Sequence, residues 1–168
     1  KVVFLANADS ADEVRKAHRH GCEGVGLFRT ESVFLRKNEI PSEDEQFEEY
    51  RLIVEAADPL PVTIRTLDLG GDKILDSIGR EKEENPFMGF RAIRYCLRHP
   101  DVFLVQLRAI LRASAYGSAK VMFPMVSGVG ELVRAKEFLS TAKRQLRERE
   151  IEFDDKIEVG CMIETPSA

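Results

Sequence analysis

The sequence predicts an α/β fold in which helices cover a parallel β-sheet. Short apolar segments alternate with longer amphipathic segments along the whole chain. The short segments are apolar at nearly every position, which is typical of strands that are buried on both faces. Two architectures remain open from the residues alone, an open doubly wound sheet and a (β/α) barrel. No G-x-G-x-x-G fingerprint follows the first strand, so the usual sign of a dinucleotide fold is missing.

Each element is expected from a local signal. The apolar runs predict strands at residues 2–5, 25–28, 62–64, 121–123 and 157–163. Apolar residues at helical spacing predict helices within residues 10–21, 42–58, 92–97, 101–117 and 132–146. Ser10 with Glu13, and Ser42 with Glu45, match the capping box that opens a helix. Gly21 is expected to end the first of these helices.

Composition limits the classes of function. The chain has 168 residues, of which 43% are hydrophobic and 32% charged, and these values suit one ordinary domain with its own core. A net charge of −4 gives no electrostatic footprint for nucleic acid. No apolar run reaches the length of a membrane helix. Cys22, Cys96 and Cys161 fit neither a disulfide framework nor a zinc site, so we expect free thiols in a reducing cytoplasm. The chain starts at Lys1 and stops just beyond a strand, so we expect an excerpt of a longer protein.

Charged residues follow three of the predicted strands directly. Arg29 and Glu31 follow the second strand, Arg65 and Asp68 follow the third, and Glu164 follows the last. The carboxyl ends of parallel strands share one edge, so these side chains are expected to gather there. Arginine grips phosphate or carboxylate oxygens with two parallel hydrogen bonds, and a glutamate oxygen suits Mg²⁺. The pattern therefore predicts a site for an anionic substrate bridged to a divalent metal.

Simpler interpretations exist for the same residues. Arg29 and Glu31 can pair with each other, and Gly70–Lys73 ("GGDK") reads as an ordinary turn. His18, His20 and His99 are expected to be solvated surface residues, because their spacing makes a poor metal site. From the residues alone, the conclusion is an α/β domain with a modest case for an anion site.

Six motifs extend this interpretation. They are "GVGLFRTE", "IRTLDLGGDK", "EENPFMGFRAIR", "LRAILRASAYG", "VMFPMV" and "GCMIETP", in this order. Together they resemble the phosphoenolpyruvate-binding C-terminal barrel of Enzyme I of the bacterial sugar phosphotransferase system, across nearly the whole chain. The resemblance implies a (β/α)8 TIM barrel of which residues 1–168 form part, about six of eight strands, with "NPFMGF" as a further short strand. The N-terminal phosphohistidine domain and the last barrel strands of that family have no counterpart here.

The resemblance also implies roles for individual residues. Arg29, Arg65 and Arg91 match arginines that bind phosphoenolpyruvate, and Glu164 matches a carboxylate ligand of the catalytic Mg²⁺. The hypothesis for Glu31 is that it orients Arg29. No catalytic residue of the family falls within this chain. Neither the phosphoryl-accepting histidine nor the proton-donating cysteine has a match, so the three histidines and Cys161 are not assigned to those roles.

The implied function is that of an enzyme fragment. In the family, the phosphoryl group of phosphoenolpyruvate moves to a histidine on another domain, which starts the phosphorylation of sugars during uptake. The family also implies a phosphocarrier protein as partner, a homodimer and a cytoplasmic location, without nucleic acid or membrane. Alone, the chain is expected to be inactive, with strand edges left open. Two alternatives stay open: a non-catalytic ligand-binding or dimerisation half-barrel, and part of a pyruvate phosphate dikinase or phosphoenolpyruvate synthase.

Overall fold

The computed structural model describes residues 2–36, 40–69 and 89–168. The strands are β1 Ala6–Ala8, β2 Val25–Arg29, β3 Val62–Arg65, β4 Ala119–Phe123 and β5 Glu158–Cys161. The helices are α1 Ala11–Arg19, α2 Glu31–Leu35, α3 Glu43–Ala57, α5 Ala92–Arg98, α6 Pro100–Ala113 and α7 Val129–Glu148, with a short 3₁₀ helix η1 at Ser114–Tyr116. Strands and helices alternate as the sequence predicts, except that the short helix α2 after β2 was not predicted. None of the helices in these ranges is long and apolar enough to cross a membrane.

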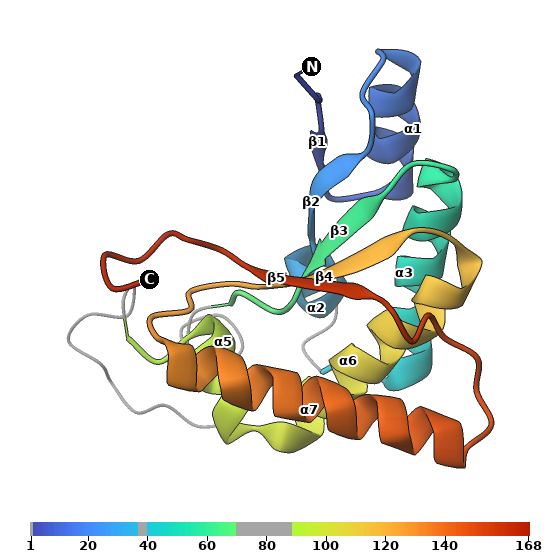
Figure 1. The fold of residues 1–168 in the computed structure, drawn as a ribbon. Coiled ribbons are helices and arrows are strands. Elements are labelled where there is room, and N and C mark those ends of the chain that lie inside the picture. Colours follow the sequence, from blue (N-terminus) through green and yellow to red (C-terminus); the bar gives the residue numbers. More distant parts are fainter. Residues whose placement is uncertain (1, 37–39, 70–88) are drawn as a thin grey trace.

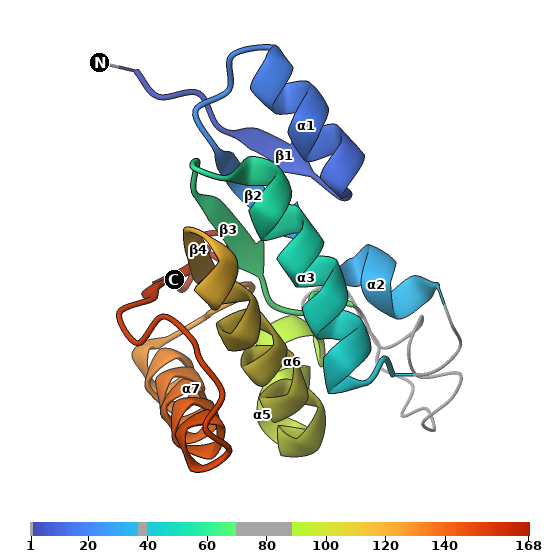
Figure 2. The same cartoon turned by 90° about the vertical axis from the view of Figure 1, so that its right-hand side faces the viewer.

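The strands of the described residues form one parallel sheet in the order β1-β2-β3-β4-β5. Helices α1, α3, α6 and α7 lie on one face of this twisted sheet (Figures 1 and 2). A doubly wound sheet carries helices on both faces, so the arrangement differs from that alternative. The α/β class with a parallel sheet is confirmed. The five strands found in the described residues do not close a barrel, so the expected TIM barrel is not shown.

The first predicted strand is misplaced. The apolar run 2–5 is not a strand, and β1 begins immediately after it, at Ala6. The side chains of the run remain exposed, from 48% for Leu5 to 73% for Val2. The run lies beside the segment that leads into β2, where the Phe4 carbonyl accepts a hydrogen bond from the amide of Glu23. The apolar pattern predicts a strand, but it belongs to a segment that lies beside the sheet. Hydrophobicity alone does not produce the hydrogen-bonded ladder that defines a strand.

The further strand expected from "NPFMGF" falls mostly on residues that the structure does not describe. Residues 85–88 lie outside the described part of the chain, and Gly89 and Phe90 form a bend. Strand β3 pairs directly with β4 over four residues, from Val62 opposite Ala119 to Arg65 opposite Met122. A strand therefore has no place between β3 and β4, and the expected number of six strands becomes five for the residues described.

The predicted starts of α1 and α3 hold because their caps form. Ser42 and Glu45 make the full capping box at the start of α3. The Ser10 side chain accepts a hydrogen bond from the amide of Glu13 at the start of α1. Gly21 follows α1 with a φ of 83°, the left-handed conformation that a glycine adopts without strain.

The core lies between the sheet and the helices that cover it. Helices α3 and α6 pack side by side on the outer face (Figure 2). Phe103 of α6 meets Phe123 of β4 edge to face, with ring centroids 6.0 Å apart. Tyr50 of α3 contacts Phe28 of β2 in a similar way at 6.3 Å. These contacts fix the strand ends against the helices, and the candidate site lies at those ends.

Candidate functional site

The carboxyl ends of the strands meet at one edge of the sheet. Arg29, the last residue of β2, lies opposite Arg65, the last residue of β3. Arg65 in turn lies opposite Met122 of β4, and Phe123 lies opposite Cys161, the last residue of β5. The strand-end prediction is therefore confirmed for the second, third and last strands. The charged residues after these strands gather at the same edge.

Arg29 is held by a carboxylate from the neighbouring strand. Its Nε and Nη2 atoms donate to the two carboxylate oxygens of Asp9, at 2.6 and 2.7 Å. Asp9 directly follows β1, so the pair joins the ends of two adjacent strands. Hydrogen bonding to Asp9 raises the pKa of Arg29, so its charge is retained. About half of the arginine side chain, 48%, is exposed, so it remains accessible to a ligand.

Arg65 lies deeper and has two carboxylate partners. Its Nη2 atom donates to Oε1 of Glu31 at 2.9 Å, and its Nη1 atom lies 3.1 Å from Oδ2 of Asp68. The side chain is only 12% exposed. The same Glu31 oxygen accepts a hydrogen bond from the amide of Asp68 at 3.1 Å. Glu31 therefore contacts Arg65 directly, whereas the hydrogen bonds of Arg29 go to Asp9, and the charge of Glu31 acts on Arg29 without a hydrogen bond in the described structure.

Two atoms of this ion pair are buried without a hydrogen-bond partner, Oε2 of Glu31 and Nε of Arg65. Buried polar atoms are nearly always paired in folded proteins. Unpaired atoms at a strand end therefore indicate a place where a ligand or another part of the protein completes the bonding. The free Nε of Arg65 is a donor, as an anionic ligand requires.

Arg91 shares Asp68 with Arg65. Its Nε and Nη2 atoms lie 3.1 and 2.7 Å from Oδ1 of Asp68, whose side chain is 8% exposed. Arg91 caps the start of α5, and the next residue, Ala92, has a φ of 52°. A positive φ is strained for alanine, and such strain is concentrated at functional sites. Asp68 therefore brings together arginines from two segments that are far apart in sequence.

We call these six residues the arginine–carboxylate cluster. Its members are Asp9, Arg29, Glu31, Arg65, Asp68 and Arg91. The structure thus brings the three predicted arginines to one edge, each bonded to a carboxylate. Two of those carboxylates, Asp68 and Glu31, follow strands in the sequence, but nothing in the sequence assigns them to particular arginines. Asp9 was missed, because it immediately precedes the helix cap at Ser10 and reads as part of that turn.

Glu164 lies beyond β5, at the same edge. Its Oε1 atom accepts a hydrogen bond from the amide of Met125 at 2.7 Å. Met125 follows β4 with a φ of 54°, so a second strained residue lies at this edge. The adjacent Thr165 anchors the segment, because its hydroxyl donates to the Val126 carbonyl at 3.0 Å. These bonds hold the Glu164 side chain, which is exposed, near the end of β4.

The fit of a metal ion rests on Glu164. In residues 2–36, 40–69 and 89–168, no group of three or more His, Cys, Asp and Glu side chains is placed to hold a metal. Glu164 supplies hard carboxylate oxygens, one of which bonds to an amide. Mg²⁺ commonly takes only one or two protein carboxylates and completes its shell with water and substrate oxygens. A single carboxylate at this edge is therefore compatible with Mg²⁺ as one ligand of its shell.

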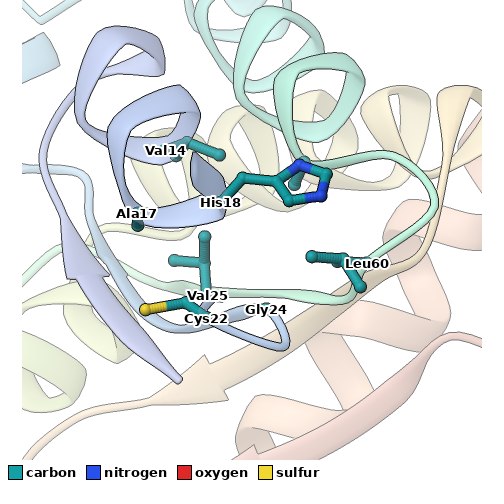
Figure 3. A pocket seen from close by; sticks show the side chains of 8 residues that line it. Val14, Ala17, His18, Cys22, Gly24, Val25 and Leu60 are labelled. Carbon is teal, nitrogen blue, oxygen red and sulfur yellow. The ribbon is translucent and has the colours of Figure 1, made fainter. Parts of the chain in front are cut away.

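The three histidines differ in their exposure to solvent. His18 and His20 are exposed on and after α1, as expected. His99 is half-buried, because its ring stacks on Tyr95 at a centroid distance of 4.2 Å, so its assignment to the solvated surface is wrong. His18 and Cys22 line a small pocket at the opposite edge of the sheet, where the chain enters β2 and β3 (Figure 3). This pocket is separate from the arginines.

The three cysteines are free thiols, as predicted. Cys96 is fully buried behind the cluster, and burial together with the charge of Asp68 raises its pKa to about 12. It is therefore a neutral core residue. The Gly70–Lys73 turn lies outside the described residues.

Comparisons with known proteins identify the family of the chain. The family described as the PEP-binding domain of PEP-utilising enzymes matches residues 1–168. A phosphoenolpyruvate-protein phosphotransferase from Bacillus sp. is 47% identical over 167 residues, which are 99% of this chain and 29% of that protein. Proteins of the same name from Haemophilus influenzae and Bacillus subtilis are 46% and 45% identical, over 100% and 99% of this chain and 29% of their own lengths. The chain thus spans 29% of the length of these curated relatives.

Proposed function

Because the chain belongs to the family of phosphoenolpyruvate-binding domains of phosphoenolpyruvate-utilising enzymes, we propose that it is the substrate-binding part of a phosphoenolpyruvate-protein phosphotransferase. The resemblance found in the six motifs is confirmed by the match along residues 1–168. Two alternatives are not favoured: a non-catalytic ligand-binding or dimerisation half-barrel, and part of a pyruvate phosphate dikinase or phosphoenolpyruvate synthase. Relatives at 44–47% identity carry the phosphotransferase name instead.

The observation that carries the proposal is the pair of neighbouring strand ends at Arg29 and Arg65. Phosphoenolpyruvate carries a phosphate and a carboxylate, and arginine binds both groups with its planar fork of donors. In the proposal, Arg29, Arg65 and Arg91 bind these groups. Their carboxylate partners hold each guanidinium in place before the substrate arrives.

The same arrangement supports the proposed chemistry. Phosphoryl transfer has a loose transition state with negative charge on the equatorial phosphoryl oxygens, so fixed positive groups stabilise it electrostatically. The bond between phosphorus and the enol oxygen breaks, and a bond to a histidine nitrogen of another domain forms. The arginines orient the phosphoryl group toward that acceptor. Mg²⁺, held in part by Glu164, would neutralise further charge on the substrate oxygens.

The proposal extends to the complete protein. Five consecutive parallel strands with helices on one face support the first part of an eight-stranded barrel, which further strands would close. A homodimer, a phosphocarrier-protein partner and a cytoplasmic location also belong to the proposal and rest on the resemblance.

The test is Arg65→Lys in the full-length protein. Lysine keeps the positive charge beside Glu31 and Asp68, so those buried carboxylates are not left without a cation, but it loses the planar fork. Loss of one preorganised donor typically lowers kcat by about 100-fold or more. We therefore expect pyruvate formation from phosphoenolpyruvate and Mg²⁺ to fall by about that factor in a protein that still folds.

The matched control is Arg51→Lys. Arg51 of α3 is 29% exposed, forms ion pairs with Glu48 and Glu55 of the same helix and lies 5.6 Å from the ring centroid of Tyr116, away from the cluster. Its replacement is expected to leave turnover unchanged. Wild-type turnover in Arg65→Lys would refute the role of Arg65. Absence of phosphoenolpyruvate-dependent phosphotransfer in the wild-type protein would refute the proposed function itself.

A further inference from the structure

We propose that Gln106, a buried residue of α6, is a positioning residue that fixes the spacing of the two strand ends carrying Arg29 and Arg65. The inference rests on the proposed function, because it concerns how the same substrate site is held. Gln106 is fully buried, at 0% exposure, in the inward stripe of α6 that also contains Phe103, Leu107 and Ile110. A buried amide in such a stripe needs hydrogen-bond partners, and those partners lie at the strand ends.

The amide of Gln106 bridges two segments. Its Oε1 atom accepts a hydrogen bond from the backbone amide of Leu67, after β3, at 2.9 Å. Its Nε2 atom donates to the hydroxyl of Thr30, after β2, at 3.2 Å. The Thr30 hydroxyl donates in turn to the carbonyl of Arg65 at 3.0 Å. One side chain of α6 and one hydroxyl therefore tie the end of β2 to the end of β3.

The bridged residues are neighbours of the cluster in sequence. Thr30 lies between Arg29 and Glu31, and Leu67 immediately precedes Asp68. The ion pair of Arg65 with Glu31 crosses from one of these segments to the other at 2.9 Å. Its geometry therefore depends on the distance between the two segments, which the Gln106 bridge sets from behind the site.

The bridge is itself held by a buried chain of hydrogen bonds. The second Nε2 hydrogen of Gln106 is donated to the hydroxyl of Tyr50 at 3.1 Å, and that hydroxyl donates to Oε1 of Gln46 at 3.1 Å. The amide of Gln46 donates to the carbonyl of Pro41 at 2.9 Å. Burial raises the pKa of Tyr50, so its hydroxyl stays protonated and remains a donor. Each member has a partner, and fully satisfied buried networks are rigid.

These contacts go beyond a packing role. An apolar side chain of similar length at position 106 would fill the same space and continue the apolar stripe of α6. It would leave the amide of Leu67 buried without an acceptor and would free the Thr30 hydroxyl from α6. The strand ends would keep the ladder between β2 and β3, the Thr30–Arg65 hydrogen bond and the Glu31–Arg65 ion pair, but they would lose the bridge from α6 that ties them to the helix layer.

The test compares Gln106→Met with Ser114→Ala in the full-length protein. Methionine keeps the length of the side chain and removes the bridge. Ser114, at the C-terminal end of α6, is the matched control. Its buried hydroxyl accepts a hydrogen bond from the backbone amide of Asp154 at 2.9 Å. Both variants lose a buried acceptor of a backbone amide, so both are expected to lower the melting temperature. Only Gln106→Met removes a contact to the strand ends.

The readout is the pair of kinetic constants for phosphoenolpyruvate, measured well below the melting temperature. Small misplacement of binding groups is costly, so we expect kcat/KM to fall by about tenfold or more in Gln106→Met and to stay unchanged in Ser114→Ala. Equal kcat/KM values in the two variants would overturn the inference. If Gln106→Met does not fold, Thr30→Val removes the same bridge from the other side while keeping the side-chain shape. Unchanged kcat/KM in that variant then overturns it.

The outcomes separate this inference from the proposed function. If the wild-type protein has no phosphoenolpyruvate-dependent activity, both the proposed function and the positioning role of Gln106 are refuted. A wild-type protein with that activity, whose Gln106→Met variant behaves like Ser114→Ala, removes only the positioning role of Gln106.

Discussion

Glu43 is the carboxylate that joins three helices, and its replacement by glutamine should lower stability in a way that depends on pH. Glu43 lies in the first turn of α3. It is 2.6 Å from Nε of Arg108, 2.9 Å from Nη1 of Arg112 and 3.0 Å from Nη1 of Arg149. Arg108 and Arg112 belong to α6, and Arg149 caps the end of α7. The Glu43 side chain is 14% exposed, so the ion pairs are largely shielded from solvent.

The magnitude follows from the burial of each partner. Arg108 and Arg112 are 16% and 15% exposed, and a hydrogen bond to a charged group contributes about 1.5–3 kcal/mol when it is shielded. Arg149 is 47% exposed, so its pair adds at most about 1 kcal/mol. Glutamine keeps one acceptor oxygen and therefore retains part of this stabilisation. We expect Glu43→Gln to lower the free energy of unfolding by about 2–4 kcal/mol.

The pH dependence gives the sharper test. Burial raises the pKa of Glu43, but hydrogen bonds and charge from Arg108, with hydrogen bonds from Arg112 and Arg149, outweigh it and leave the pKa below its ordinary value of 4.5. A carboxylate with a lowered pKa stabilises the folded state fully above its unfolded pKa, and that contribution is lost as pH falls through the folded pKa. The difference between the wild type and Glu43→Gln should therefore be constant near neutral pH and shrink below about pH 4.5.

Calorimetry of thermal unfolding over a range of pH values checks this. A loss of about 2–4 kcal/mol corresponds to a melting temperature lower by roughly 5–12 °C in a domain of this size. The control is Glu48→Gln on the same helix, whose exposed pair with Arg51 should contribute less than about 1 kcal/mol. Equal melting temperatures for the two variants, or a difference from wild type that persists unchanged in acid, would refute the reasoning.

Two smaller predictions concern thiol reactivity and a glycine. The Cys96 thiol, fully buried and with its pKa raised to about 12, should react with a thiol reagent only on unfolding, whereas half-buried Cys22 should react in the native protein; rapid native labelling of both would contradict this. Gly24→Ala should cost about 1–3 kcal/mol, because Gly24 has a φ of 148° and an added Cβ would lie 2.7 Å from the Pro61 carbonyl oxygen. Gly128→Ala, where nothing lies within 4 Å, is the control, and equal melting temperatures would show that the close approach is harmless.

The sequence predicted those site residues that follow directly from strand topology. Arg29, Arg65 and Glu164 come immediately after apolar runs, so any parallel sheet would bring them to one edge. Arg91 follows no predicted strand of that kind, and only the resemblance pointed to it. The pairing of Glu31 with Arg65 was not predictable, because it depends on the direction that the chain takes after β2.

Gln106 was also missed, although the sequence contains a signal. It stands three residues after Phe103 and one before Leu107, within an otherwise apolar helical stripe. A polar residue in such a stripe indicates a buried hydrogen-bond network, but it does not name the partners. Those partners, Thr30 and Leu67, lie 76 and 39 residues away, so only the fold brings them together.

The errors in the fold have the same origin. The apolar run 2–5 has the composition of a strand, yet the ladder to β2 forms from Ala6. Strand length depends on hydrogen-bond register, which hydrophobicity alone does not determine. The helix boundaries were more predictable, because caps such as Ser42 with Glu45 are complete within a few residues.

The composition of the arginine–carboxylate cluster has a kinetic consequence. Three arginines face three carboxylates, so the cluster carries no surplus of positive charge. A distant anion therefore meets almost no long-range attraction from these six residues, and diffusion toward them is not steered. Under the proposed function, recognition of the substrate would start only at contact distance, where the remaining guanidinium hydrogens meet its oxygen atoms. The rate constant for association of an anion with these six residues should accordingly depend only weakly on ionic strength. Discrimination between anions would then come from the geometry of the contacts.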